Sequence, residues 1–478
     1  MKFNRAVAAV LVAASVFSTV GMSRRAPPAT SSDLNATEPQ FRELYKELVE
    51  TNTSLSVGDC TLAAERMAAR MRAAGFADSD SRVFSVPEHP KEGGLVATFH
   101  GSDPTKKAIL LLAHIDVVEA KREDWTRDPF TFIEENGYFY ARGVVDDKAM
   151  AAYFTDILIN YKREGYVPKR TLKMALTCGE ESSGAFNGAK WLSENHRDWI
   201  DAEFAINEGA GGALDANGNR VALNIQAGEK VYQDFTLETT NPGGHSSQPV
   251  PQNALYDMAR AISAVAAHEF PAQLNDATRE YFTRLAPTQT PEIAAAMRAI
   301  VANPNDAAAD AILSRNKQWH SMLRTTCVGT MIEGGHAKNA LPQRVRTNVN
   351  CRIFPGASVD SVQAALAGAI NNDKVAISLS GPRSPATPTP SLGANILAPI
   401  EAIAARHFPG TPIIPVMTTG ATDAIYTSAA GIPTYGFSAI FMDADLSGIH
   451  GLNERIRVKS IMDARKFQYE LIKYYADH

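Results

Sequence analysis

The sequence predicts an α/β fold with a mainly parallel sheet flanked by helices and interrupted by an inserted α+β domain. The stretches 108–113, 170–177 and 202–207 are short apolar runs of the kind found in strands buried on both faces. A segment with an apolar helical face, 150–161, lies between the first two runs. After residue 228 apolar and polar residues alternate, which indicates an antiparallel sheet with one wet face.

The length of the chain favours two domains. It has 478 residues, more than one typical domain holds. Hydrophobic residues make up 45% and charged residues 21%, as in ordinary soluble proteins. The net charge of −5 gives no basic footprint, so no nucleic acid partner is expected. We predict an insertion at 229–381, flanked by the two parts of the main domain at 40–228 and 382–478.

The N-terminus has the pattern of a secretory signal. Lys2 and Arg5 form a basic start, and an apolar run follows over 6–20. We therefore predict a signal peptide at 1–26, followed by a Pro-, Ser- and Thr-rich linker at 27–39. The protein would be exported, periplasmic or secreted, with no stable membrane span after signal removal. The alternative is an uncleaved N-terminal membrane anchor, although the run is short of the ~20 apolar residues of a spanning helix.

The first part of the main domain begins with a helix over 63–74, which Gly75 ends. Alternating or apolar runs then predict strands over 82–86, 94–100, 108–113, 170–177 and 202–207, with the 150–161 helix among them. An Asn136-Gly137 turn precedes the segment that leads into that helix.

The insertion combines alternating strands with helices. Strand patterns cover 231–239 and 335–354, and helical spacing recurs at 255–265, 293–301 and 307–313. Four prolines in 382–390 mark the return linker. The main domain then resumes with a helix over 397–407, strands over 413–417 and 433–437, and an amphipathic helix that Ser460 could cap.

Four cysteines are spread widely along the chain, at Cys60, Cys178, Cys327 and Cys351. No C-x-x-C pair occurs, which excludes a thiolate zinc knuckle. Cys178 lies in an apolar strand pattern and is predicted to be a buried residue. Cys327 and Cys351 lie in strand-like segments of the insertion and could pair, a question that the sequence leaves open.

Metal-capable side chains follow each of the three apolar runs. His114 and Asp116 end the first run two residues apart, so they share one face of the strand. Glu180 and Glu181 follow the second run, and Glu208 follows the third. In open α/β sheets ligands bind at this edge, and buried carboxylates are costly unless they are paired or bound to metal.

A fourth acidic position precedes the 150–161 helix, at Asp146 and Asp147. A carboxylate there can be a helix cap or a metal ligand. We interpret Asp147 as a cap and Lys148 as a solvated charge. An oxygen-rich donor set that includes a histidine suits zinc, or manganese or cobalt, better than copper.

Six short motifs together resemble one family. They are His114-Ile-Asp116, Arg142-Gly-Val-Val-Asp-Asp-Lys148, Gly179-Glu-Glu-Ser-Ser183, Asn207-Glu-Gly209, Gly243-Gly-His-Ser-Ser247 and His450-Gly-Leu-Asn-Glu454. In this order they resemble the di-zinc family of glutamate carboxypeptidase, carnosinase, aminoacylase and succinyl-diaminopimelate desuccinylase. The likeness is greatest to the branch of carboxypeptidase S and the N-acyl-amino-acid hydrolases.

The resemblance implies a role for each matching residue. His114, Asp146 and Glu208 would hold one metal, and Asp146, Glu181 and His450 the other. Asp116 would orient His114, and Glu180 would be the general base towards a water bridging the metals. His245 would steady the substrate oxyanion, and Asn339 and Arg352 would grip a substrate carboxylate. The alternatives without a catalytic role are that His245 is a turn residue and Arg352 a solvated strand residue. We interpret Asp423 as a supporting or structural residue in its loop.

The resemblance also implies a zinc-exopeptidase-like fold and a chemistry. The cofactors would be two Zn²⁺, with Co²⁺ or Mn²⁺ as alternatives. The substrate would be a small peptide or an N-acyl amino acid, cleaved at an amide bond. The inserted domain would act as a lid that closes over the site or as the surface of a homodimer. The alternative function is a catalytically inactive exported binding protein, against which the presence of Glu180 and all five ligands argues.

Overall fold

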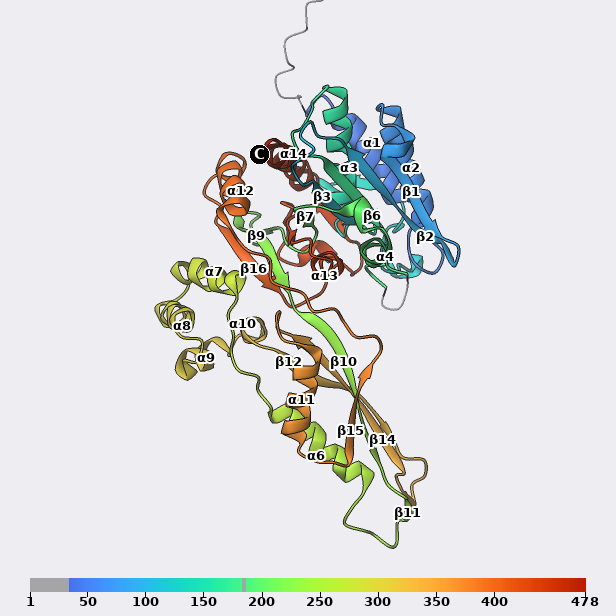
Figure 1. The fold of residues 1–478 in the computed structure, drawn as a ribbon, viewed down its shortest axis with the longest axis vertical. Helices are drawn as coiled ribbons and strands as arrows, with labels where there is room; N and C mark the ends of the chain where they lie inside the picture. Colours follow the sequence, from blue (N-terminus) through green and yellow to red (C-terminus); the bar gives the residue numbers. More distant parts are fainter. Residues whose placement is uncertain (1–33, 183–185) are drawn as a thin grey trace, which may run out of the picture.

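The computed structural model describes residues 34–182 and 186–478 (Figure 1). The predicted signal peptide, 1–26, and the first part of the predicted linker lie outside the described residues. Helix α1 (Glu38–Glu50) begins inside the stretch predicted as linker, with Pro39 in its first turn. Across the described ranges, no helix combines the length and the apolar character that crossing a membrane requires.

The larger sheet is mixed and mainly parallel at its centre, which confirms the predicted α/β fold class. Within the described residues it has ten strands in the order β1-β2-β6-β3-β7-β17-β9-β8-β18, with β16 paired to β9. They are β1 (Ser81–Val86), β2 (His89–Phe99), β3 (Ile109–His114), β6 (Leu172–Thr177), β7 (Phe204–Asn207), β8 (Gly212–Leu214), β9 (Arg220–Glu229), β16 (Ile413–Thr418), β17 (Thr434–Gly436) and β18 (Phe441–Met442). Strand β3 lies parallel to both β6 and β7.

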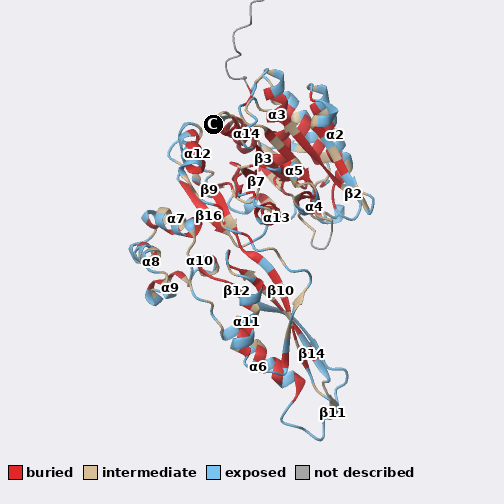
Figure 2. Ribbon diagram, in the orientation of Figure 1, coloured by how far each residue is buried: buried red, intermediate tan, exposed pale blue. Residues whose placement is uncertain are grey.

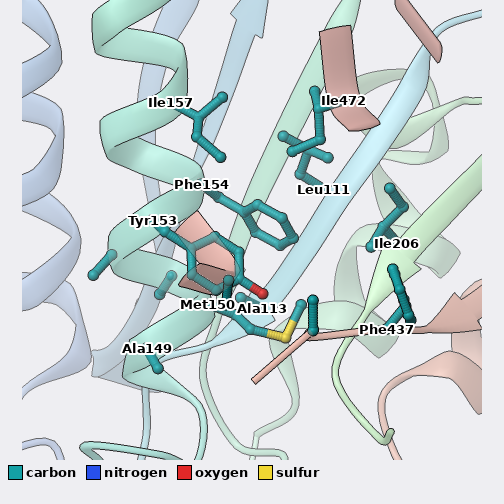
Figure 3. Packing of buried hydrophobic residues seen from close by; sticks show 14 of the residues in the cluster. Leu111, Ala113, Ala149, Met150, Tyr153, Phe154, Ile157, Ile206, Phe437 and Ile472 are labelled. Carbon is teal, nitrogen blue, oxygen red and sulfur yellow. The ribbon is translucent and has the colours of Figure 1, made fainter. Parts of the chain in front are cut away.

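Helices cover both faces of this sheet. One core packs against α1, α2 (Cys60–Ala73), α3 (Lys148–Arg163), α12 (Ala394–His407) and α14 (Val458–Asp477), and the other against α4 (Gly188–Asn195) and α5 (Arg197–Ile200). Strand β3 contributes Leu111 to the first core and Leu110 to the second, so it is buried on both sides, as its apolar run predicts. Figure 3 places Leu111 near Phe154 of α3 and Ile472 of α14.

A second sheet forms the core of what we call the outer lobe, residues 231–267 and 326–380. Its strand order is β12-β14-β10-β15, all antiparallel. The elements are β10 (Val231–Thr240), β11 (Gly244–His245), α6 (Ala254–Ala267), β12 (Thr326–Gly334), β13 (Ala340–Leu341), β14 (Arg344–Ile353), α11 (Val359–Ile370) and β15 (Val375–Ser380). Val345, Val349 and Ile353 of β14 are buried between exposed or half-buried neighbours, which confirms the predicted alternation (Figure 2).

Four helices between β-strands of the outer lobe form a separate helical cluster, residues 276–323. They are α7 (Asp276–Leu285), α8 (Pro291–Ala302), α9 (Ala307–Leu313) and α10 (Lys317–Leu323), with their own apolar core. Arg284 of α7 donates to Glu401 of α12 at 2.7 Å and to the Ile413 carbonyl at 3.0 Å. The helical cluster therefore lies against the β16 edge of the larger sheet, although its sequence falls within the predicted insertion.

The two lobes are joined by a nearly continuous strand. β9 ends at Glu229 and β10 begins at Val231, and Figure 1 shows them as one ribbon running from the larger sheet into the outer lobe. Gly228, just before this junction, has a φ of +127°, which favours glycine. The return segment after β15 is tied to β10, because the Ser384 N–H donates to Oε1 of Gln233 at 3.0 Å.

Two local predictions were wrong. Helix α14 begins at Val458, and Ser460 is a buried residue inside its first turn rather than its cap. Lys148 is fully buried, and its Nζ donates to the Thr51 carbonyl at 2.8 Å, so it is not a solvated charge. Cys178 is buried, as predicted, and it also forms a disulfide with Cys60 at the start of α2, a pairing that the sequence does not indicate.

The second disulfide joins Cys327 and Cys351 on the neighbouring strands β12 and β14, the pairing that the sequence left open. Asp147 occupies the N-cap position of α3, as predicted, but its side chain makes no capping hydrogen bond. Its burial and the nearby carboxylates raise the pKa of Asp147 well above the usual value.

Candidate metal centre and active site

The candidate site lies where three strands of the larger sheet end together. β3 ends at His114, whose register partner on β6 is Thr177, and Cys178 to Glu181 continue from there. β7 ends at Asn207, directly before Glu208. Because these strands are parallel neighbours, their carboxyl ends meet at one edge, as the sequence predicts.

Asp146 lies between two imidazoles at this edge. Its Oδ1 is 3.1 Å from Nε2 of His114, and its Oδ2 is 3.1 Å from Nε2 of His450. His450 also lies 2.9 Å from Oε2 of Glu181. One carboxylate therefore faces two different histidines, each through its own oxygen.

The charges of these groups are strongly coupled. Burial opposes ionisation of Asp146, but the hydrogen bonds from the two imidazoles hold its pKa below its usual range. Bonds to Asp146 and Glu181 raise the pKa of His450 to about 10. Burial works against His114, but its carboxylate neighbours raise its pKa well above 6.5.

Glu180 and Glu208 complete the acidic cluster. Burial raises the pKa of Glu180 to about 10, with His114 opposing and the charge of Glu208 adding to the rise. Burial and the charge of Asp146 likewise raise the pKa of Glu208. Four half-buried carboxyls thus share the space around two imidazoles, and the raised pKa values of Glu180 and Glu208 mean that both would ionise readily only if a cation took the place of their protons.

The donor set fits a pair of divalent cations. His114, Asp146 and Glu181 each offer a ligand atom within 4.8 Å of the others. His450 adds a nitrogen 3.1 Å from the second oxygen of Asp146, and Glu208 is near enough for the charge of Asp146 to raise its pKa. Imidazole nitrogen and carboxylate oxygen are donors that zinc accepts, and manganese or cobalt also bind such sets.

Asp116 connects His114 to the loop of the two glutamates. Its Oδ1 lies 3.6 Å from Nδ1 of His114, whose closer contact is the Asp116 carbonyl oxygen at 3.1 Å. The same carboxylate accepts from the backbone N–H of Glu181 at 3.1 Å and of Glu180 at 3.4 Å. Asp116 is 4% exposed, so this hydrogen-bond network is shielded from bulk solvent.

Glu454 is a supporting residue whose role no sequence motif indicates. It is fully buried, and its carboxylate accepts from the Arg142 guanidinium at 2.7 Å. It also accepts from the backbone N–H groups of Gly143, Val145 and Asp146 at 3.0, 2.9 and 3.2 Å. Glu454 therefore shapes the loop that carries Asp146.

The local fold explains how Glu454 reaches that loop. Strand β19 (Arg455–Arg457) follows it directly and pairs with β5 (Tyr138–Tyr140), which also pairs with β4 (Ile133–Glu135). Neither the His450–Glu454 motif nor the Arg142 motif indicates this contact, because 312 positions separate the two residues.

Asp423 supports the loop of the two glutamates, in agreement with its prediction as a supporting residue. Its Oδ1 accepts from Nδ2 of Asn187 at 2.7 Å and its Oδ2 from Oγ1 of Thr177 at 3.0 Å. Asn187 also donates to the Gly179 carbonyl at 3.1 Å. Burial raises the pKa of Asp423 to about 6.

The three predicted substrate residues all belong to the outer lobe and not to the strand ends that carry the acidic cluster. His245 is exposed in β11 at the tip of the outer lobe, and its register partner is Ala340 of β13 (Figure 1). Asn339 is beside it, since its carbonyl accepts from the Ser246 N–H at 3.0 Å. Arg352 lies at the other end of β14, with its guanidinium 4.7 Å from the Tyr232 ring.

The sequence from residue 110 to residue 474 matches the model of peptidase family M20/M25/M40. The chain belongs to this family. Peptidase family M20 comprises metal-dependent hydrolases of the peptidase and amidohydrolase type, so the chain is an enzyme of this class.

Three known proteins illustrate the family relationship. The chain is 28% identical over 406 residues to human N-fatty-acyl-amino acid synthase/hydrolase PM20D1, covering 82% of this chain and 79% of that protein. It is 30% identical over 289 residues to carboxypeptidase S of Saccharomyces cerevisiae, covering 58% and 50%. The M20 family metallo-carboxypeptidase Sso-CP2 of Sulfolobus solfataricus superposes with a TM-score of 0.65 at 19% identity, over 91% of this chain and 99% of that one.

Proposed function

We propose that this M20 enzyme is an exported two-metal hydrolase of amide bonds in small peptides or N-acyl amino acids. The observation that carries the proposal is the position of Asp146, whose two oxygens face His114 and His450 at 3.1 Å each. A carboxylate in that position can join two cations, and paired metals are a recurrent device for hydrolysis.

The proposed ligands are those of the sequence analysis. His114, Asp146 and Glu208 would hold one cation, and Asp146, Glu181 and His450 would hold the other, with zinc as the preferred metal and cobalt or manganese as alternatives. When bound, such cations polarise the scissile carbonyl and make water more acidic. Asp116 keeps the His114 ring in place, as carboxylate partners of ligating histidines commonly do.

Glu180 is the proposed general base. It accepts a proton from the attacking water as the water oxygen bonds to the carbonyl carbon. It then passes this proton to the amine nitrogen, which leaves as the C–N bond breaks. The products are a carboxylate and an amine. Asp423 and Asn187 hold the Gly179 carbonyl just before Glu180, which limits the movement of the base.

We further propose that His245 acts in a second copy of the chain. Its place at the tip of the outer lobe keeps it from the acidic cluster of its own chain. The edge strand β12 supports a homodimer, because the side chains of Val328, Met331 and Ile332 are 56, 72 and 59% exposed. An exposed apolar edge strand is suited to pairing with its counterpart.

A complementation experiment tests this arrangement. His245→Ala should lower kcat by roughly 10²–10³-fold, as for loss of an oxyanion donor. When His245→Ala chains are co-expressed with Glu180→Gln chains, mixed dimers contain one intact site, and activity should recover to about a quarter of wild type. No recovery would mean that His245 acts within its own chain or not at all.

Arg352 would grip the carboxylate of the substrate. Its guanidinium lies near the junction of the lobes and is held over Tyr232 rather than in an ion pair with a carboxylate of the described structure. Arg352→Lys keeps the positive charge but loses the planar guanidinium, which can donate two hydrogen bonds to one carboxylate. Substrate binding should weaken most, so KM should rise more than kcat falls.

The central test is a substrate panel with metal analysis. Purified enzyme with its metals should hydrolyse N-acyl amino acids or dipeptides, and a chelator should abolish the activity. Glu180→Gln should keep the metals and lose the activity. A metal-loaded wild type that cleaves no member of the panel would support the alternative, an exported binding protein.

Export itself is proposed from the basic start and apolar run of residues 1–26. Two disulfides in the described residues are consistent with an oxidising compartment. Fractionation and N-terminal sequencing of the mature protein distinguish a cleaved signal from an uncleaved anchor.

A further inference from the structure

The junction between the lobes carries two adjacent buried ionisable side chains, whose partners lie on opposite sides. Glu229 is 4% exposed and Lys230 is fully buried. The Lys230 ammonium donates to the carbonyl and Oγ of Ser321 and to Oγ1 of Thr326 at 3.0–3.1 Å, that is, to the helical cluster and the outer lobe. Glu229 turns towards the larger sheet instead.

Glu229 reaches one side of the Glu208 segment through a threonine. Its Oε2 accepts from Oγ1 of Thr422 at 2.9 Å. The same Thr422 hydroxyl accepts from Nδ2 of Asn207 at 3.2 Å. Asn207 is the last residue of β7 and immediately precedes Glu208, so two hydrogen bonds join the lobe junction to a proposed metal ligand.

A second route runs to the other side of Glu208. Oε2 of Glu229 also accepts from Nε2 of Gln226 at 3.2 Å. The Gln226 side chain packs directly on Gly209, where a Cβ atom would come within 2.4 Å of its Oε1. The residues before and after Glu208 are thus both held by groups that bond to one carboxylate oxygen.

The burial of Glu229 destabilises the fold, so we look for a functional reason for a carboxyl at this position. Oε1 of Glu229 has no hydrogen-bond partner among the described residues, and neither does Oε1 of Gln226. Burial raises the pKa of Glu229 to about 8, with the bonds from Thr422 and Gln226 opposing. An apolar residue would fill this space without a buried, half-satisfied carboxyl.

We propose that Glu229 is a positioning residue that fixes Glu208 from the junction of the two lobes, through Thr422 on one side and Gln226 on the other. The inference rests on the proposed function, because it takes Glu208 as a metal ligand. In this role, Glu229 connects the lobe junction to the metal site, because the segment that joins the lobes also holds the backbone around Glu208. Supporting residues of this kind typically alter metal affinity or activity by about 10–100-fold.

The test compares Glu229→Ala, Glu229→Gln and Thr422→Val. We expect Glu229→Ala to weaken the binding of one of two zinc ions by about 10–100-fold in a chelator competition. Thr422→Val, which keeps the shape and removes the hydroxyl relay, should fall between alanine and wild type. Glu229→Gln keeps an acceptor oxygen for both donors and should restore most of the affinity.

Hydrogen exchange of the metal-free proteins gives a second reading that does not depend on catalysis. Amides of 207–209 and 420–423 should exchange faster in Glu229→Ala than in wild type or Glu229→Gln. Asp156→Ala is the matched control, because Asp156 is a buried carboxylate paired with Arg465, a residue of α14. It should lower stability without changing the zinc affinity of the folded protein.

Two outcomes overturn the inference: wild-type zinc affinity and exchange in Glu229→Ala, or a Glu229→Gln variant as defective as alanine. The proposed function can fail independently. If wild-type protein binds zinc but cleaves no substrate, while Glu229→Ala still weakens one zinc ion, the positioning role stands without the activity.

Discussion

Replacing Glu454 by alanine tests whether the Asp146 loop depends on one buried carboxylate. The Glu454 and Arg142 side chains are 1% and 3% exposed and meet at 2.7 Å. Removing one partner of a buried ion pair typically costs about 3–5 kcal/mol, because the other charge stays buried and unpaired. Three backbone N–H groups would also lose their acceptor, each worth about 1–3 kcal/mol where no water replaces it.

We therefore expect Glu454→Ala to lower the free energy of unfolding by at least about 3 kcal/mol, measured by urea denaturation. Glu454→Gln keeps an oxygen for Val145 and Asp146 but turns an amide towards Arg142, so its loss should be smaller. The control is Asp360→Ala, which breaks the exposed pair with Arg383 and should cost less than about 1 kcal/mol. If Glu454→Ala costs no more than the control, the loop does not depend on this network.

Three further predictions concern the site. Glu180→Gln should keep the metal content and lower kcat by about 10²–10⁴-fold, measured by steady-state kinetics and metal analysis; full turnover would remove Glu180 from the mechanism. His114→Ala and His450→Ala should each lower bound zinc and thermal stability, and two zinc ions retained by either would contradict the ligand set. Glu229 faces Asp423, Glu208 and Tyr426, and burial raises its pKa to about 8, above the value of ~4.3 in the unfolded chain. The protonated form of Glu229 therefore favours the folded state, and this contribution to stability is lost as the pH rises towards 8. The stability of Glu229→Gln relative to wild type should therefore increase between about pH 5 and pH 8 in urea titrations, and a difference that stays constant would count against the raised pKa.

The parts of the fold that the sequence predicts are those set by local pattern. The apolar run before His114 becomes β3, buried on both faces, because no polar side chain interrupts it. The alternation around Val349 becomes β14 with one buried face, for the same local reason. Parallel neighbours then bring the strand ends carrying His114, Glu180 and Glu208 to one edge.

The remaining features depend on contacts that no local pattern records. Arg142 and Glu454 are a buried ion pair between distant parts of the chain, and the pairing of β19 with β5 brings them together. Lys148 carries a charge in a helix start that is usually solvated, but α1 covers it and offers the Thr51 carbonyl. The position of the helical cluster on β16 likewise follows from packing of α7, not from its place in the chain.

The Cys60–Cys178 disulfide has a consequence for maturation. It ties the start of α2 to the residue directly before Gly179-Glu180-Glu181, across 118 positions. In a reducing compartment both cysteines would be thiols, and the glutamate loop would be held only by noncovalent contacts such as those of Asp116 and Asn187. If the chain is exported as proposed, the last covalent step in building the site takes place outside the cytoplasm.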